Sequence, residues 1–100
     1  MKQDLEKAIS MVMSTGKVKL GFKAVLDSVL NGKIKTVVTS NNLPQNSKIR
    51  LLRGCKLSNI PIIDIDRTGI ELGAICGRPH KISVLAVLDP GKSKILEYFD

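Results

Sequence analysis

The order of the hydrophobic patterns constrains the fold of this chain more than any other feature. Segments with the signals of an amphipathic helix alternate with short runs of β-branched and other apolar residues along all 100 residues. Helix followed by strand, repeated four times, is typical of layered α/β proteins in which helices cover both faces of a sheet. The sequence therefore predicts a three-layer α/β/α sandwich around about four strands, with no repeat or linker to suggest a second domain.

The element boundaries follow from apolar spacing, capping residues and turn residues. The predicted helices are Asp4–Ser14, Phe22–Leu30, Gln45–Leu57 and a short one from Thr68 to about Gly77. The predicted strands are Val18–Leu20, Ile34–Ser40, Ile60–Ile65 and Ile82–Leu88, with a short terminal strand or packed tail at Ile95–Phe99. Because the run from Ile34 to Ser40 does not alternate cleanly, we expect it to be a central strand covered on both faces.

Two helices carry more detailed expectations. In the third, Ile49, Leu52 and Cys55 are predicted to face inward. The fourth opens with the T-x-x-E form of a capping box, in which Thr68 and Glu71 satisfy each other's backbone N–H groups. Its glycines recur every four residues, which predicts a bare helix face packed closely on the sheet.

Chain topology predicts where a ligand would bind. Right-handed crossovers allow the first three strands to run in one sense, so that their C-terminal ends share one edge. Open α/β sheets usually bind ligands at such an edge.

The composition favours a polyanionic partner. Sixteen Lys and Arg against nine Asp and Glu give a formal charge of +7 and a pI near 9.7. The 43% hydrophobic content suffices for one core, whereas 3% aromatic residues leave little material for stacking on bases. No apolar run is long enough to span a bilayer, and the first residues alternate in charge, so we expect a soluble intracellular protein.

Metal chemistry finds little support in the sequence. Cys55 and Cys76 fit neither a C-x-x-C knuckle nor a disulfide scaffold, and we expect both to be reduced thiols in the core. Asp64 and Asp66 lie at the exit of a predicted strand, where carboxylates usually belong to a solvated loop; a magnesium site is the alternative.

Enzymatic chemistry is also weakly supported. The stretch from Gly16 to Lys23 begins like a phosphate-binding loop, but Phe22 and Lys23 stand where that motif requires Lys and then Ser or Thr. His80 is the single histidine, and no G-x-S-x-G elbow accompanies it. A small α/β enzyme using Glu71 and His80 remains the alternative from a different class.

Three segments carry groups that suit nucleic-acid binding. They contain Gly21, Phe22 and Lys23; Ser40, Asn41 and Asn42; and Arg78, Pro79, His80, Lys81 and Ile82. A glycine at a helix N-terminus exposes backbone N–H groups to a phosphate, an asparagine amide can pair with a base edge, and the third segment adds fixed charges and an imidazole. The alternatives are a plain turn with a core phenylalanine, a capped loop and a merely solvated loop.

Four motifs, in this order, resemble one known family. They are Leu20-Gly21-Phe22-Lys23, the strand exit Val37–Asn42, the helix start Ile70-Glu71-Leu72-Gly73, and Gly77-Arg78-Pro79-His80 before an apolar strand. With the turn Asp89-Pro90-Gly91, the whole chain resembles the archaeal and eukaryotic large-subunit ribosomal protein thirty-e family, within the kink-turn-binding superfamily.

The resemblance implies a four-stranded mixed sheet, no catalysis, no cofactor, and binding to ribosomal RNA at a kink-turn in the cytoplasmic ribosome. It assigns Gly21 and Lys23 to the phosphate backbone, Asn41 to a guanine edge and the loop from Arg78 to Ile82 to an unstacked base. Asn42 stays open for the guanine role, because Pro44 stands one residue later than the family pattern has it. Neighbouring ribosomal proteins are expected as partners, a monomer as the free state, and a small guide-RNA particle as the alternative setting.

Overall fold

The computed structural model describes residues 2–93 and residue 95. Its elements are α1 (Lys2–Thr15), β1 (Lys17–Leu20), α2 (Phe22–Leu30), β2 (Thr36–Thr39), α3 (Gln45–Ser58), β3 (Ile62–Asp64), α4 (Gly69–Ile75) and β4 (Val84–Asp89). All eight helices and strands predicted before residue 90 are present. The predicted terminal strand at Ile95–Phe99 lies outside the described residues except for Ile95, which is buried.

The four strands form one mixed sheet in the order β1-β4-β2-β3. β2 and β3 are parallel, while β4 runs antiparallel to both β1 and β2. β1, β2 and β3 therefore run in one sense, as predicted, and β4 starts at the edge where the other three end. The prediction of an interior strand at β2 is also confirmed, because all four of its residues are buried.

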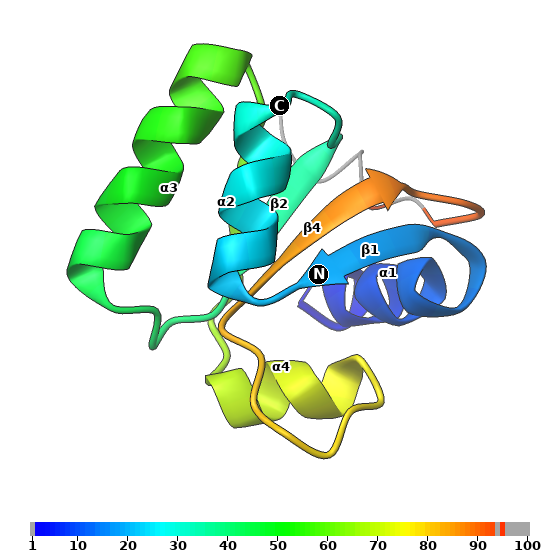
Figure 1. Ribbon diagram of the computed structural model, residues 1–100. Coiled ribbons are helices and arrows are strands. Elements are labelled where there is room, and N and C mark those ends of the chain that lie inside the picture. Colours follow the sequence, from blue (N-terminus) through cyan, green and yellow to red (C-terminus); the bar gives the residue numbers. More distant parts are fainter. Residues whose placement is uncertain (1, 94, 96–100) are drawn as a thin grey trace.

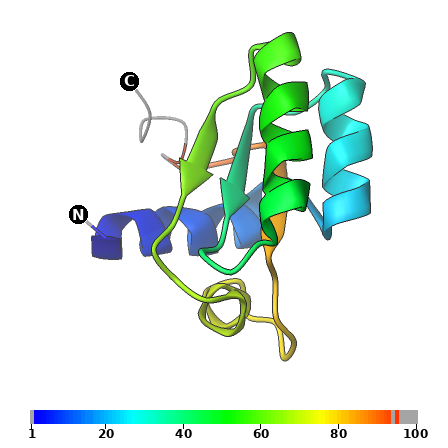
Figure 2. The same ribbon diagram turned by 90° about the vertical axis from the view of Figure 1, so that its left-hand side faces the viewer.

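Helices cover both faces of the sheet, which confirms the three-layer sandwich (Figures 1 and 2). α2 and α3 lie side by side on one face, α1 lies on the other, and α4 lies below the strand ends. Alternate residues of each inner strand feed two cores: Val38 and Leu85 pack toward α1, whereas Val37 and Val84 pack toward α2 and α3. None of the helices in the described residues is long and apolar enough to cross a membrane.

The buried face of α3 differs from the prediction. Ile49 is 46% exposed and Leu52 is 45% exposed, while Leu51, Gly54 and Cys55 are buried. Apolar residues surround more than half of this helix, so spacing alone could not identify the side that meets the sheet. On the inward side, Gly54 lets α3 approach α2 closely. The prediction that Cys55 faces inward is confirmed.

The glycine face of α4 also packs differently from the prediction. A Cβ atom added to Gly73 would overlap the carbonyl oxygen of His80, and one added to Gly69 would lie 3.3 Å from that of Ile82. The bare face therefore meets the segment that returns to β4, whereas Leu72 and Cys76 pack in the core. Gly77 ends the helix with a φ of 73°, a left-handed conformation that glycine adopts readily.

Candidate nucleic-acid interface at the strand-exit edge

Backbone hydrogen bonds to Ser83 and Val84, which directly follow the third predicted binding segment, bring the first two segments beside it at the end of the sheet where β1, β2 and β3 finish. The Gly21 N–H donates to the Val84 carbonyl over 3.3 Å, and the Ser40 N–H donates to the Ser83 carbonyl over 2.9 Å. The Asn41 N–H donates to a carbonyl just before α4, again over 2.9 Å. We call this region the strand-exit edge; it contains the turn into α2, the loop after β2, and the segment between α4 and β4.

The turn into α2 presents uncapped backbone N–H groups. Gly21 is the N-cap residue, with φ 93° and ψ 145°, and its conformation is one that a residue with a Cβ atom rarely adopts. No side chain accepts a hydrogen bond from the first turn, so the positive end of the helix dipole faces outward. Lys23 is exposed beside it, whereas Phe22 is partly buried and packs on the core between α2, α3 and the sheet.

The two asparagines after β2 have different surroundings. Asn42 accepts a hydrogen bond of 2.6 Å through its Oδ1 atom from the Ser40 hydroxyl, and its amide lies against Gly69 at the start of α4. The side chain of the exposed Asn41 makes a long contact of 3.4 Å, from Nδ2 to the Asp66 carboxylate. Asn42 therefore braces the loop against α4, while the Asn41 amide is better placed to exchange its contact for a ligand.

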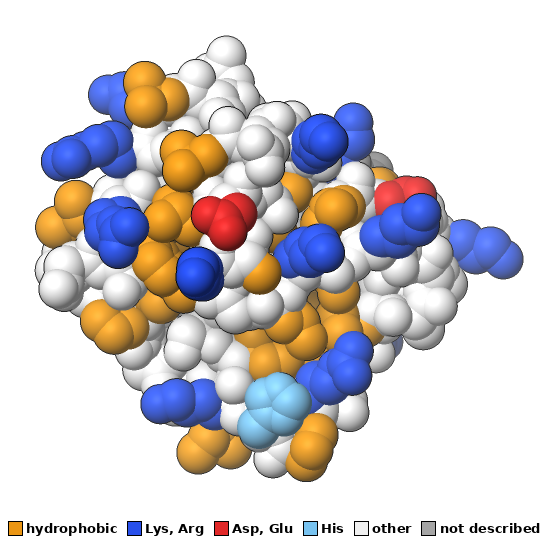
Figure 3. All heavy atoms as spheres, in the orientation of Figure 1, with side chains coloured by type: hydrophobic (Ala, Val, Ile, Leu, Met, Phe, Trp, Pro, Cys, Tyr) orange, Lys and Arg blue, Asp and Glu red, His pale blue; other side chains and the backbone are white. Residues whose placement is uncertain are grey.

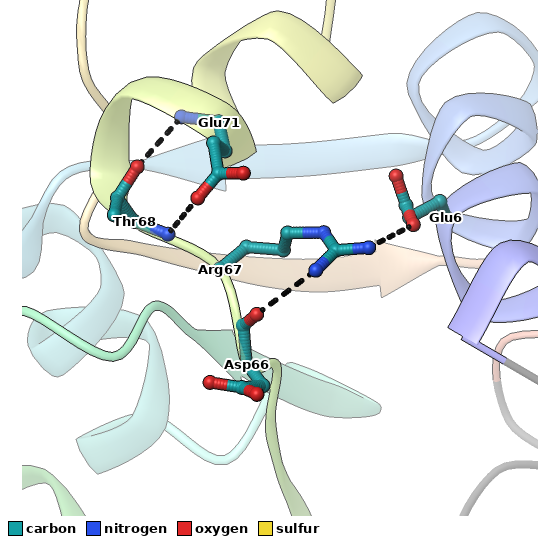
Figure 4. Close-up of polar contacts among 5 residues, drawn as sticks. All are labelled: Glu6, Asp66, Arg67, Thr68 and Glu71. Carbon is teal, nitrogen blue, oxygen red and sulfur yellow. Dashed lines mark hydrogen bonds and ion pairs between the residues drawn. The ribbon is translucent and has the colours of Figure 1, made fainter.

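The backbone that holds Asn41 is supported by side chains from distant parts of the chain, and Figure 4 shows two of them, Arg67 and Glu6. The Arg67 carbonyl accepts from Asn41, and the Arg67 guanidinium donates to Glu6 of α1 over 3.0 Å and to the Asp66 carbonyl over 3.2 Å. The side chains of Arg67 and Glu6 are 30% and 27% exposed, so this ion pair is partly shielded from water. It ties α1 to the segment that enters α4.

The predicted capping box at the start of α4 is confirmed. The Thr68 N–H donates to Glu71 over 3.0 Å, and the Glu71 N–H donates to the Thr68 hydroxyl over 3.2 Å (Figure 4). Hydrogen bonding by the Thr68 backbone, and next by its side chain, lowers the pKa of Glu71 below its usual value. Glu71 is therefore an ionised structural acceptor, which does not suit the general acid that an enzyme would need.

The segment from Arg78 to Ile82 is anchored to α4 at both ends. The Arg78 N–H donates to the Gly73 carbonyl over 2.8 Å, and the Ile82 N–H donates to the Gly69 carbonyl over 2.9 Å. Between these anchors, Pro79, His80 and Lys81 are exposed. In Figure 3 the single histidine lies beside an apolar surface, with basic side chains on both sides.

Not every predicted binding residue can offer its side chain to a ligand. Ser40 is 2% exposed and Ile82 is 4% exposed, so these two hold the edge together from inside. The exposed members are Gly21, Lys23, Asn41, Asn42, Arg78, Pro79, His80 and Lys81. The arrangement thus combines N–H donors, fixed positive charges, an amide and an imidazole within one surface.

The two carboxylates after β3 have structural partners. Asp64 accepts hydrogen bonds from the Thr39 hydroxyl and, over 2.9 Å, from the Lys48 ammonium group. Partial burial alone would raise the pKa of Asp64, but the hydrogen bonds from Thr39 and Lys48 and the charge of Lys48 together lower it. Asp66 contacts the Asn41 amide. Both carboxylates therefore have protein partners, an arrangement that favours a structural role over the alternative of a magnesium site.

Sequence reasoning missed the supporting residues of the edge. Arg67 and Glu6 are 61 positions apart, and only the packing of α1 beside the β3–α4 connection brings them together. The close contact of Gly73 with His80 was missed for the same reason. The periodic glycines were the available signal, but they do not reveal which segment approaches them.

Comparisons with known proteins agree with this architecture. The chain belongs to the ribosomal protein L7Ae/L30e/S12e/Gadd45 family, whose model matches residues 3–97. It is 43% identical to the large ribosomal subunit protein eL30 of Methanocaldococcus jannaschii, over 94% of this chain and 86% of that protein. It is 40% identical to the eL30 protein of Sulfolobus acidocaldarius, over 98% of this chain and 94% of the relative.

A solved structure shares the same fold. A protein of unknown function from Bacillus halodurans matches 97% of this chain and 95% of its own with a TM-score of 0.80, at 25% sequence identity. The family resemblance and the α/β/α architecture expected from the sequence are therefore both confirmed.

Proposed function

We propose that this protein is a structural constituent of the large ribosomal subunit and binds ribosomal RNA at a kink-turn through the strand-exit edge. The observation that carries the proposal is the meeting, at one end of the sheet, of an uncapped helix N-terminus, an exposed asparagine amide and an exposed basic loop. Relatives at about 40% identity over almost the whole chain are named as large-subunit proteins, which supports the ribosomal setting.

Each part of the edge has a separate role in this proposal. Gly21 and Lys23 bind phosphate oxygens, which positions the RNA without reading its sequence. The Asn41 amide pairs with a guanine edge that sheared pairing leaves open, and the surface of Pro79 and His80 packs against an unstacked base. Such groups read a bent, non-Watson–Crick shape rather than a regular groove, which suits a chain with few aromatic residues.

The alternatives are less well supported. A protein of a guide-RNA particle would carry a more acidic helix start after the binding asparagine, whereas the first turn of α3 contains no acidic residue. An enzyme using Glu71 and His80 would need a mobile carboxyl group, and Glu71 is held in the capping box. We therefore propose one non-catalytic RNA-binding domain over residues 1–100, monomeric when free and cytoplasmic as part of the ribosome.

A gel-shift comparison of a kink-turn hairpin with a straight duplex tests the binding mode. Asn41→Ala should reduce the preference for kinked RNA by about 5- to 150-fold, the loss of a contact worth roughly 1–3 kcal/mol. Residual salt-sensitive binding should remain, because phosphate contacts do not depend on the amide.

Asn42→Ala is the matched control. It should leave the preference for kinked RNA nearly unchanged but lower thermal stability, because the Ser40 hydroxyl loses its acceptor at a buried position. The reverse pattern would assign the guanine contact to Asn42. Loss of binding only in Lys and Arg variants would refute the kink-turn proposal, and failure to co-sediment with large subunits would refute the ribosomal one.

A further inference from the structure

A second surface lies between α2 and α3, on the face of the sheet opposite α1. The two helices approach closely at Gly54, where an added Cβ atom would lie 3.1 Å from Val29. Beside this contact is an open groove of about 230 Å³. We call it the α2–α3 groove; it is lined by Leu26, Leu30, Arg50, Arg53, Gly54 and Leu57.

Two leucines of this groove are unusually exposed. Leu57 is 82% exposed and Leu30 is 63% exposed. Large aliphatic side chains that gather in one exposed groove commonly mark a protein-binding surface. A dry cavity of about 150 Å³ holds a benzene-sized group, so this groove has room for at least one large apolar side chain.

The end of the groove formed by Leu30 and Leu57 lies away from the strand-exit edge, whereas Arg50 at its other end lies over Phe22. Leu30 is the last residue of α2, whereas Phe22, its first residue, lies beside the edge. Eight residue steps of about 1.5 Å place them roughly 12 Å apart along the helix. A side chain seated at the Leu30 end of the groove therefore leaves the edge open to an RNA.

The rim of the groove is positively charged. Arg50 lies over the Phe22 ring, 5.6 Å from its centroid, and Arg53 is exposed on the next turn. α3 carries four basic residues and no acidic one, as its sequence QNSKIRLLRGCKLS shows. Figure 3 shows basic and apolar side chains interspersed over α2 and α3. Among the described residues, neither arginine belongs to an ion pair.

We propose that the α2–α3 groove docks an acidic segment of a neighbouring large-subunit protein. An aliphatic side chain of that segment packs between Leu30 and Leu57, and a carboxylate pairs with Arg53. RNA would satisfy the arginines, but the leucines offer its bases neither an aromatic ring nor a hydrogen-bonding group. A second copy of this chain would bring a further charge of +7 against the same basic rim. The proposal rests on the ribosomal part of the proposed function, since that is where the partner resides.

Site-specific photo-crosslinking in assembled large subunits tests the proposal. A photoreactive phenylalanine analogue replaces Leu57, and subunits are purified on a high-salt gradient before irradiation and mass spectrometry. The matched control carries the same analogue at Met11, which is 44% exposed on α1. We expect the Leu57 position to crosslink to a ribosomal protein at a segment with carboxylates around an aliphatic residue. Adding Arg53→Glu should lower this yield at least 5-fold.

The other outcomes each have a definite meaning. Crosslinking of position 57 to RNA or to a second copy, or the same product from position 11, overturns the docking proposal. Co-sedimentation without any crosslink at position 57 overturns it as well, while leaving the ribosomal function intact. Failure to co-sediment refutes both the ribosomal function and the partner placed within it.

Discussion

Replacing Gly73 with alanine tests whether α4 sets the position of the loop from Arg78 to Ile82. An alanine Cβ at position 73 would lie less than 3.0 Å from the His80 carbonyl oxygen. Contacts this short are essentially never observed for real Cβ atoms. The obstructing atom belongs to the backbone, so the loop itself must move. The Gly73 carbonyl also accepts the Arg78 N–H over 2.8 Å, which leaves little freedom for a local adjustment.

The expected loss of stability follows from two opposing effects. Alanine in a helix interior is favoured over glycine by about 1 kcal/mol. Overpacking of a close contact costs roughly 1–3 kcal/mol. Gly73→Ala should therefore lower the free energy of unfolding by about 0–2 kcal/mol, measured by urea denaturation, and leave the protein folded. Its preference for kinked over straight RNA should fall, because Pro79 and His80 are displaced from the strand-exit edge.

Gly54→Ala is the matched control for this substitution. It places the same extra atom in the interior of α3, but the nearest neighbour is a side-chain methyl of Val29 at 3.1 Å rather than a backbone atom. The RNA preference should remain that of the unaltered protein, whatever the change in stability. If Gly73→Ala also keeps the full preference, then the position of the loop does not decide specificity and this reasoning is wrong.

Two further predictions concern charge and titration. Lys23→Ala should weaken RNA binding and reduce the slope of affinity against salt by about one counterion. The unfolding midpoint should not change, because Lys23 is exposed. An unchanged slope would exclude a phosphate contact at Lys23. Burial raises the pKa of the Cys55 and Cys76 thiols to about 11 from 9.0, so the folded state keeps protons that the unfolded state releases. Their contribution to stability is complete below about pH 9 and falls as the pH rises through 11. Urea denaturation should show that the Cys55→Ala/Cys76→Ala variant loses less free energy of unfolding than the unaltered protein as the pH rises from 9 to 11.

The fold was largely predictable because its signals are local. The capping box of Thr68 and Glu71 needs only a four-residue pattern, and the run around Val37 and Val38 has the β-branched composition of a strand buried on both faces. Strand direction followed from the handedness of crossover connections. The exposed positions of Ile49 and Leu52 were not predictable, because α3 has apolar residues on several sides and only its contact with α2 selects one.

The candidate site was predictable as a set of segments but not as a set of side chains. Topology brings the turn at Gly21, the loop at Asn41 and the segment at His80 to one edge, as the direction of the strands required. The inward orientation of Ser40 and Ile82 depends on contacts that have no local pattern. Binding by the exposed residues stays a prediction until RNA is tested.

The short helix α4 explains how the asparagine loop and the His80 segment are linked. A helix of seven residues is too short to be stable in isolation, so its order must come from tertiary contacts and its cap. Gly69 contacts the Asn42 amide on one side and receives the Ile82 N–H on the other, while the Arg67–Glu6 ion pair holds the preceding turn against α1. A disturbance of α4 must therefore reach both of the segments proposed to contact bases. Conversely, an RNA that holds both segments would stabilise α4 against local opening.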